Sequence, residues 1–247
     1  MNISDYFFES AEAYLNSSLL FLFPASLFMA ANILFGNPKL MVFILPFLVV
    51  SFIFFQLHLA KVRAGAKTDF RYLSQPGSLF QTTKILPLYE NKLKPGLLLF
   101  SPEGLKLGEM KKIFTDEFRA YHHVYELRDE NLLAKACYGL RSERIDVFRA
   151  HGDYIGCLYK EGKQWLVEAA GQPGTARIES SPLFMDVKVI SKINKVECRL
   201  RRGYMPVEVS SIFQNANSPI LDFENNVTEE EKLIFFAMLL KEFFMDR

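Results

Sequence analysis

The residues best suited to bind a ligand form a basic cluster towards the C-terminal end of the chain. It comprises Arg199, Arg201 and Arg202, with Lys192 and Lys195 upstream. In a strand, alternate residues share a face, so Arg199 and Arg201 would present planar, bidentate donors to the phosphate of a lipid headgroup. The same spacing is typical of a solvated strand face. The cluster therefore predicts lipid-phosphate binding, with a solvated surface as the alternative.

The histidines and cysteines do not form a metal-binding pattern. His122 and His123 are adjacent in a predicted strand and so point to opposite faces. Cys137, Cys157 and Cys198 are separated by spacings that match no zinc motif. We therefore expect no metal site and three buried free thiols.

Catalytic motifs do not occur either. The chain contains no Gly-x-Ser-x-Gly elbow, no Gly-rich phosphate loop followed by Lys-Ser/Thr and no Cys/His signature. The acidic residues Asp129, Glu130 and Glu229 to Glu231 are explained as turn and helix-start residues. We expect no catalytic residue, no cofactor and no enzymatic activity.

Two long uncharged stretches near the N-terminus predict membrane spans. Ala13 to Pro38 and Leu40 to Ala60 contain no charged residue, and about 20 apolar residues cross a hydrocarbon core. We predict an N-terminal arm over residues 1–14 and a transmembrane hairpin over 15–60, with helices at about 15–36 and 39–60. Gly36-Asn37-Pro38 supplies the turn. A buried helical hairpin of a soluble protein is the alternative.

Basic residues near the spans predict the orientation of the hairpin. Lys61, Arg63, Lys67 and Arg71 follow the second span, whereas Lys39 alone lies in the connection. Cytoplasmic loops carry an excess of Lys and Arg. A cleaved signal peptide is excluded because its basic n-region and short apolar core are missing. We expect a multi-pass protein of the cell membrane with two spans and both termini in the cytoplasm.

The part beyond the hairpin has the composition of a globular β domain. The whole chain of 247 residues has a formal net charge of +1, which argues against nucleic-acid binding by bulk charge. Residues 61–95 are rich in Pro and Gly and predict a linker and domain edge. A domain over 96–247 follows, with strands expected at Leu97–Ser101, Arg119–Leu127, Leu132–Tyr138, Arg144–Arg149, Tyr154–Lys160, Gln164–Ala169, Arg177–Glu179, Phe184–Ile190, Ile193–Arg201 and Val207–Phe213.

A C-terminal helix breaks the strand pattern. Thr228 and Glu231 form a capping box, and the positions from Leu233 to Leu240 are all apolar. A helix that is apolar on every face must be buried all round. We expect it to be enclosed by the β structure, and the alternative is a helix lying on the membrane surface.

The domain resembles the tubby C-terminal-like superfamily, which includes tubby proteins, plant LURP-one-related proteins and phospholipid scramblases. The resemblance rests on the hairpin series Tyr125 to Lys135 and Ile145 to Gly156, on Ser218 to Phe223, and on Thr228 to Leu233 with the apolar helix after it. It implies a closed β-barrel of about twelve strands around a central apolar helix. A pleckstrin-homology-like domain with additions is the structural alternative.

The predicted function combines these parts. We expect a membrane-anchored, non-enzymatic protein whose cytoplasmic tubby-like domain binds lipid headgroups or a protein partner at the membrane surface. The resemblance implies lipid binding, since tubby proteins bind phosphoinositides through basic residues and scramblases move lipids. The alternatives are a lipid-handling, scramblase-like protein and a regulator or immunity-type protein that acts on another membrane protein. The expected partners are membrane lipids and a membrane protein, and not nucleic acid.

Overall fold

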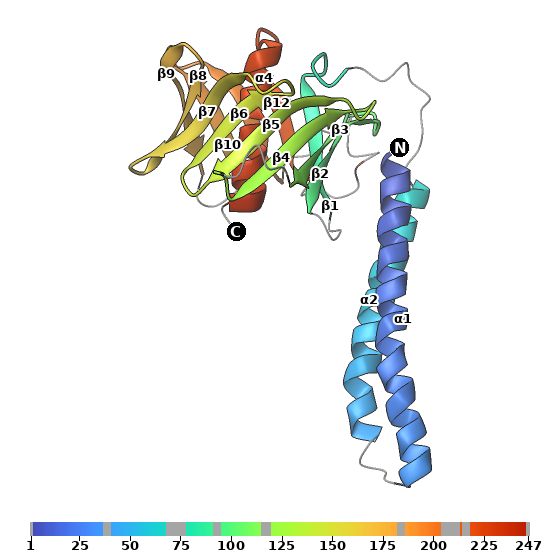
Figure 1. Ribbon diagram of the computed structural model, residues 1–247. Helices are drawn as coiled ribbons and strands as arrows, with labels where there is room; N and C mark the ends of the chain where they lie inside the picture. Colours follow the sequence, from blue (N-terminus) through green and yellow to red (C-terminus); the bar gives the residue numbers. More distant parts are fainter. Residues whose placement is uncertain are drawn as a thin grey trace. The chain divides into compact units, whose positions relative to one another are not determined.

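The computed structural model divides the chain into two compact units, Met1–Arg71 and Tyr72–Arg247. The structure describes residues 2–36, 41–67, 78–90, 95–114, 120–181, 186–203, 213 and 218–245. Each unit is considered by itself. The first is a helical hairpin and the second is a β-barrel with its own core (Figure 1).

The first unit consists of helices α1 (Ile3–Phe35) and α2 (Met41–Lys67). Asn2 caps α1 through a capping box with Asp5, and Gly36 ends the helix in the left-handed conformation with φ of 58°. Because α1 starts at Ile3, the predicted N-terminal arm over residues 1–14 is helical from Ile3 onwards and continuous with the first predicted span. At 1.5 Å per residue α1 is about 50 Å long, which exceeds the thickness of a hydrocarbon core.

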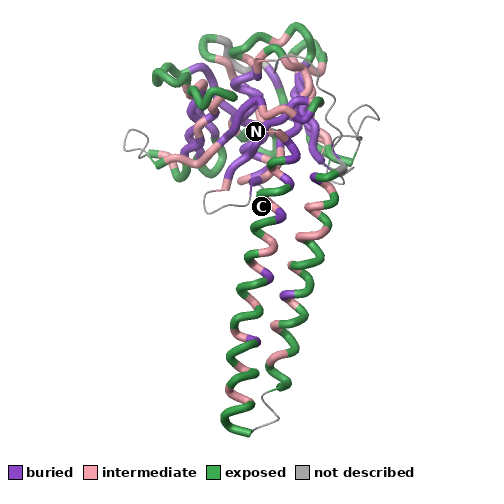
Figure 2. The backbone as a smooth tube through the Cα atoms, turned by 90° about the vertical axis from the view of Figure 1, so that its right-hand side faces the viewer, coloured by how far each residue is buried: buried purple, intermediate pink, exposed green. Residues whose placement is uncertain are grey.

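Both helices are long and apolar enough to span a membrane. Only 11% and 6% of the residues in their most apolar stretches are buried, and most of their large apolar residues are exposed or partly exposed (Figure 2). A hairpin in the core of a soluble protein would be mostly buried, and the structure does not show this. Pro24 and Pro46 lie inside the helices, as expected for membrane segments whose neighbours satisfy the freed carbonyls.

Contacts between the two helices are aromatic and polar. The ring of Phe28 stacks on Phe43 and Phe47 with centroid distances of 6.0 and 5.8 Å. Ser18 Oγ donates to the carbonyl oxygen of Ser51 at 3.0 Å, and Ser51 Oγ donates to that of Ser18 at 3.0 Å. Small hydroxyl residues allow close approach and join membrane helices by hydrogen bonds.

The second unit is a closed antiparallel barrel of twelve strands. Its strands are β1 (Lys84–Glu90), β2 (Gly96–Phe100), β3 (Lys106–Ile113), β4 (His123–Asp129), β5 (Ala134–Arg141), β6 (Arg144–Arg149), β7 (Tyr154–Glu161), β8 (Gln164–Ala169), β9 (Gln172–Ser180), β10 (Asp186–Ser191), β11 (Val196–Arg201) and β12 (Ile220–Phe223). Each strand pairs with the next along the chain, and β1 pairs with β12 to close the barrel. Closure removes the exposed edges of the sheet and agrees with the predicted fold.

Three strands, β1, β3 and β12, are not among the ten predicted from the strand pattern, and β12 lies in the segment Ser218 to Phe223 that carries the resemblance. Strand β1 lies inside the predicted linker over 61–95, and residues 61–67 of that linker belong to α2. Strand β1 was not predicted because it contains Pro87. In the structure β1 pairs with β12 only through Lys84 and Ile85. Pro87 therefore lies where the strand has a single neighbour, and its missing N–H is tolerated there. Strand β3 was missed because Leu107, Met110 and Ile113 recur every third residue. The predicted strand Val207–Phe213 lies outside the described residues except for Phe213, which is not in a strand.

The C-terminal helix fills the barrel. It consists of α4 (Glu229–Phe235), α5 (Ala237–Leu240) and a π-helical turn, η3 (Lys241–Met245). Every residue from Leu233 to Leu240 is buried and belongs to the core cluster with the inward side chains of the strands. Tyr138 Oη on β5 donates to the carbonyl oxygen of Leu233 at 2.9 Å. The predicted enclosure of this helix is confirmed, and a barrel closed around it excludes the pleckstrin-homology-like alternative.

A buried lysine fixes the start of this helix. Lys232 is 5% exposed, and its Nζ donates to the carbonyl oxygens of Phe80 and Thr82 at 2.5 and 3.2 Å. The ring of Phe223 lies 5.3 Å from Nζ. Burial lowers the pKa of Lys232. These contacts join the segment just before β1, near the start of the domain, to the helix at its C-terminal end.

Candidate functional site

The predicted basic cluster lies on one hairpin but is divided along it. Lys192 and Lys195 lie at the exposed turn between β10 and β11, Arg199 and Arg201 lie on β11, and Arg202 follows that strand. At about 3.3 Å per residue the turn and Arg202 are about 23 Å apart. The five residues therefore do not form one site.

The two strand arginines already bind carboxylates. Arg199 Nε and Nη2 donate to the two carboxylate oxygens of Asp186 at 2.7 and 2.8 Å. Hydrogen bonding to Arg199 holds the pKa of Asp186 below its usual value, and the same bonds raise the pKa of Arg199. Arg201 Nη2 donates to Asp222 at 3.3 Å. The guanidinium groups that the sequence offered to a lipid phosphate are therefore engaged within the sheet.

The remaining predicted basic residues differ in their surroundings. Lys195 Nζ donates to Asn226 Oδ1 at 3.0 Å and lies 3.8 Å from Glu224. Lys192 and Arg202 are exposed. In the hairpin, Lys61 Nζ lies 5.4 Å from the ring of Phe7 and Arg63 is exposed. Lys67 is the last residue of α2, and Arg71 lies outside the described residues.

The two ends of the barrel differ in charge. Successive turns of an antiparallel barrel lie at alternate ends, so the β5–β6 and β7–β8 turns share an end with Arg202, whereas the β4–β5 and β10–β11 turns share the other end with the start of α4. The exposed charged residues described at the first end, here called the basic end, are Arg141, Glu143, Arg144, Lys160, Glu161, Lys163, Glu179 and Arg202. Five are basic and three acidic, so their sum is 5 − 3 = +2.

The opposite end carries the opposite charge. Its exposed charged residues among those described, which define the acidic end, are Glu103, Glu130, Arg149, Asp153, Arg177, Lys192, Lys195, Glu224, Glu229 and Glu230. Four are basic and six acidic, so their sum is 4 − 6 = −2. Exposed apolar side chains also lie at this end, since Leu132, Leu133 and Ile193 are 57%, 59% and 81% exposed. Over the described residues, the two ends of the barrel therefore carry net charges of opposite sign.

Two concave regions lie near the β10–β11 hairpin. A cleft of about 280 Å³ runs over the outer face of β10, β11 and β12, and Arg199, Arg201 and Asp222 line it. A larger cavity of about 490 Å³ opens at the acidic end, between α4 and strands β8, β9 and β11. The larger volume lies within the range of small-ligand sites.

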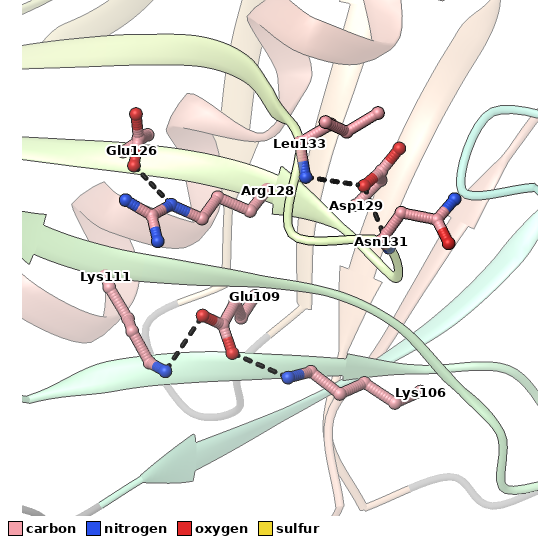
Figure 3. Close-up of polar contacts among 8 residues, drawn as sticks. All are labelled: Lys106, Glu109, Lys111, Glu126, Arg128, Asp129, Asn131 and Leu133. Atoms are coloured by element: carbon pink, nitrogen blue, oxygen red, sulfur yellow. Dashed lines mark hydrogen bonds and ion pairs between the residues drawn. The ribbon is translucent and has the colours of Figure 1, made fainter. Parts of the chain in front are cut away.

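The outer face of β3 and β4 carries charges in an alternating arrangement (Figure 3). The carboxylate of Glu109, 3% exposed, accepts from Lys106 at 2.6 Å and lies 2.8 Å from Lys111 Nζ. Lys111 is opposite Glu126 and Glu109 is opposite Arg128, and Glu126 also pairs with Arg128 along the strand. Burial alone raises the pKa of Glu109, but the two lysines outweigh it and hold the pKa below its usual value. The three basic and two acidic side chains sum to 3 − 2 = +1, and both carboxylates are held by basic neighbours within the face.

A second network on the outer face surrounds a buried carboxylate. Asp146 is 4% exposed, accepts from Tyr121 Oη at 3.0 Å and from Arg144 Nε at 2.6 Å. The ring of Tyr121 lies against Gly139, where a Cβ atom would come within 2.5 Å of the ring. Arg141 lies 4.7 Å from the centroid of that ring. The sequence alone does not reveal this network, because it joins residues of three different segments.

The thiols and possible metal ligands can be placed as well. Cys137, Cys157 and Cys198 are free and buried, which confirms that prediction. Burial raises the pKa of Cys198 well above its usual value, so this thiol is protonated. Within the described ranges, no group of three His, Cys, Asp or Glu residues comes close enough to hold a metal ion.

The chain matches no protein-family model and no curated protein sequence. The X-ray structure of a protein from Arabidopsis thaliana is similar to it at 12% sequence identity, with a TM-score of 0.45. The similarity covers 72% of this chain and 95% of the plant chain.

Proposed function

We propose that this protein is anchored in the cell membrane by its hairpin and that its cytoplasmic barrel binds the headgroups of anionic lipids. Two observations support the anchor. The outer surface of α1 and α2 is apolar over a membrane-spanning length, and Lys61, Arg63, Lys67 and Arg71 follow the second helix, which favours cytoplasmic termini. An apolar surface of this size marks contact with lipid or protein.

The unequal charge of the two barrel ends carries the lipid-binding part of the proposal. Arg199 and Arg201 are engaged by Asp186 and Asp222, so the exposed residues Arg141, Lys163 and Arg202 at the basic end are the better headgroup donors. Each Lys or Arg near an anionic surface contributes about 1 kcal/mol. The field between the ends would also orient the barrel with its basic end towards the bilayer.

We further propose that the barrel is tubby-like and that the protein has no enzymatic activity. An apolar helix enclosed by twelve antiparallel strands is the architecture that the sequence resemblance implies. The buried carboxylates Glu109 and Asp146 are each bound to basic side chains on the outer face. In this arrangement they act as structural ion pairs.

A vesicle-binding experiment tests the proposal. The core cluster of the barrel draws only on residues between Leu79 and Phe243, so residues 72–247 can be studied without the hairpin once circular dichroism and cooperative thermal unfolding have confirmed the fold. Co-sedimentation with phosphatidylcholine vesicles is compared with vesicles that also contain phosphatidylserine. We expect binding only to the anionic vesicles, and weaker binding as salt rises. Equal binding to both vesicle types, or none to either, would exclude lipid-headgroup binding.

A further inference from the structure

The cavity at the acidic end has an apolar floor. Val167 on β8, Ala176 on β9, and Ile234 and Phe235 on α4 form this floor and are all buried. No side chain of the described residues fills the space between them. A hydrocarbon stem of a ligand would therefore meet apolar atoms in it.

The rim of the same cavity is polar and mainly acidic. Glu197 on β11 and Glu231 on α4 both line it, together with Ser191 and Lys192. Glu231 is held in place by the helix cap, since its Oε2 accepts from the backbone N–H and the hydroxyl of Thr228, both at 2.8 Å. Burial and then the charge of Glu231 raise the pKa of Glu197. A cation placed between these two carboxylates would relieve their mutual repulsion.

We propose that this cavity binds a basic side chain of a protein partner, with its aliphatic stem on the apolar floor and its charged group at Glu197 and Glu231. Lys and Arg combine an apolar stem with a cationic end, which is the combination that the cavity offers. The site lies at the end of the barrel opposite the proposed lipid-binding residues and does not depend on lipid binding.

The surroundings of the cavity favour a peptide chain over a free amine. Ile193, at the rim, is 81% exposed, and Glu229 extends the negative charge beyond the cavity. Glu224 and Glu230 are paired with Lys195 and Arg149. A small amine would occupy the cavity alone, whereas a protein surface would also cover the exposed isoleucine and Glu229.

Methyl NMR of the full chain in phosphatidylcholine nanodiscs tests the site. With isoleucine methyl groups labelled, Ile193 and Ile234 report on the cavity, and Ile85 and Ile145, which do not line it, serve as internal controls. The probes are acetylated, amidated Gly-Gly-X-Gly-Gly peptides in which X is lysine, norleucine or glutamate, and hexylammonium chloride as the free amine. We expect the lysine peptide to shift Ile193 and Ile234, and to bind about threefold more tightly than the uncharged norleucine peptide.

Two variants make the result decisive. Glu197→Gln should reduce the affinity of the lysine peptide to that of the norleucine peptide, whereas the control Glu179→Gln, at the basic end, should leave it unchanged. Ala176→Leu should fill the floor and abolish the shifts of Ile234, with Ile85 showing whether the barrel is intact. Equal binding of the lysine and glutamate peptides, or tighter binding of hexylammonium than of the lysine peptide, would overturn the proposal.

Discussion

Replacement of Phe236 by alanine tests whether the barrel depends on the helix inside it. Phe236 is fully buried between α4 and α5, and its ring meets that of Phe223 edge-on at a centroid distance of 5.6 Å. Removing a buried phenylalanine side chain costs about 3–5 kcal/mol, because the transfer free energy is lost and a cavity remains. For a domain of this size that loss lowers the melting temperature by about 10 °C.

The assay uses the single tryptophan of the chain. Trp165 lies on β8 and packs against the core cluster, so its fluorescence follows unfolding of the barrel in urea or on heating. Phe114→Ala is the matched control, since Phe114 is 79% exposed and its loss should change the free energy of unfolding by less than about 0.5 kcal/mol. A loss below about 1 kcal/mol for Phe236→Ala, or equal losses for both variants, would refute the central position of the helix.

Three further predictions concern side chains outside that helix core. Gly139→Ala should lower stability and displace the ring of Tyr121, because a Cβ at this position would come within 2.5 Å of it; an unchanged melting temperature would contradict the packing. Asp186→Asn should destabilise the barrel at neutral pH, since Arg199 loses its partner. The folded pKa of Asp186 is lowered from 3.8, so the difference from wild type should be full above about pH 5 and shrink as the pH falls towards that folded pKa; a difference that grows on acidification would contradict it. Lys232→Met should lower the melting temperature at pH 7, because two carbonyl oxygens before β1 lose their donor, and an equal or raised melting temperature would show that the buried amine is dispensable.

Features that depend on local pattern were predictable from the sequence. The hairpin follows from two uncharged stretches of spanning length, and the enclosed helix follows from eight apolar positions in succession after Thr228. The capping box at Thr228 and Glu231 forms as predicted. These elements depend on neighbouring residues only, so their sequences determine them.

Features that depend on register were not predictable. The sequence predicted that the arginines of the basic cluster are available to bind phosphate. Arg199 instead binds Asp186, which lies on the adjacent strand, and only the pairing of β10 with β11 brings these two residues together. Strand β3 was missed because its apolar residues Leu107, Met110 and Ile113 recur every third residue and not every second one. The cavity is built from β8, β9, β11 and α4, which no single segment of sequence reveals.

The most direct test of the lipid-binding proposal removes the same charge from either end of the barrel. A basic-end variant combines Arg141→Gln, Lys163→Gln and Arg202→Gln. An acidic-end variant combines Arg149→Gln, Lys192→Gln and Lys195→Gln. Each variant loses three positive charges, so the two domains have equal net charge. The acidic-end variant also removes the partners of Glu224 and Glu230. Thermal unfolding of both variants shows whether the barrel is retained.

Binding of these two variants to vesicles containing phosphatidylserine is the measurement that decides between docking by a defined end and attraction by bulk charge. At about 1 kcal/mol for each basic residue near the surface, the basic-end variant should bind about 100-fold more weakly than wild type at low salt. The acidic-end variant should retain nearly full affinity. Equal losses in both variants, or the greater loss in the acidic-end variant, would contradict docking through the basic end.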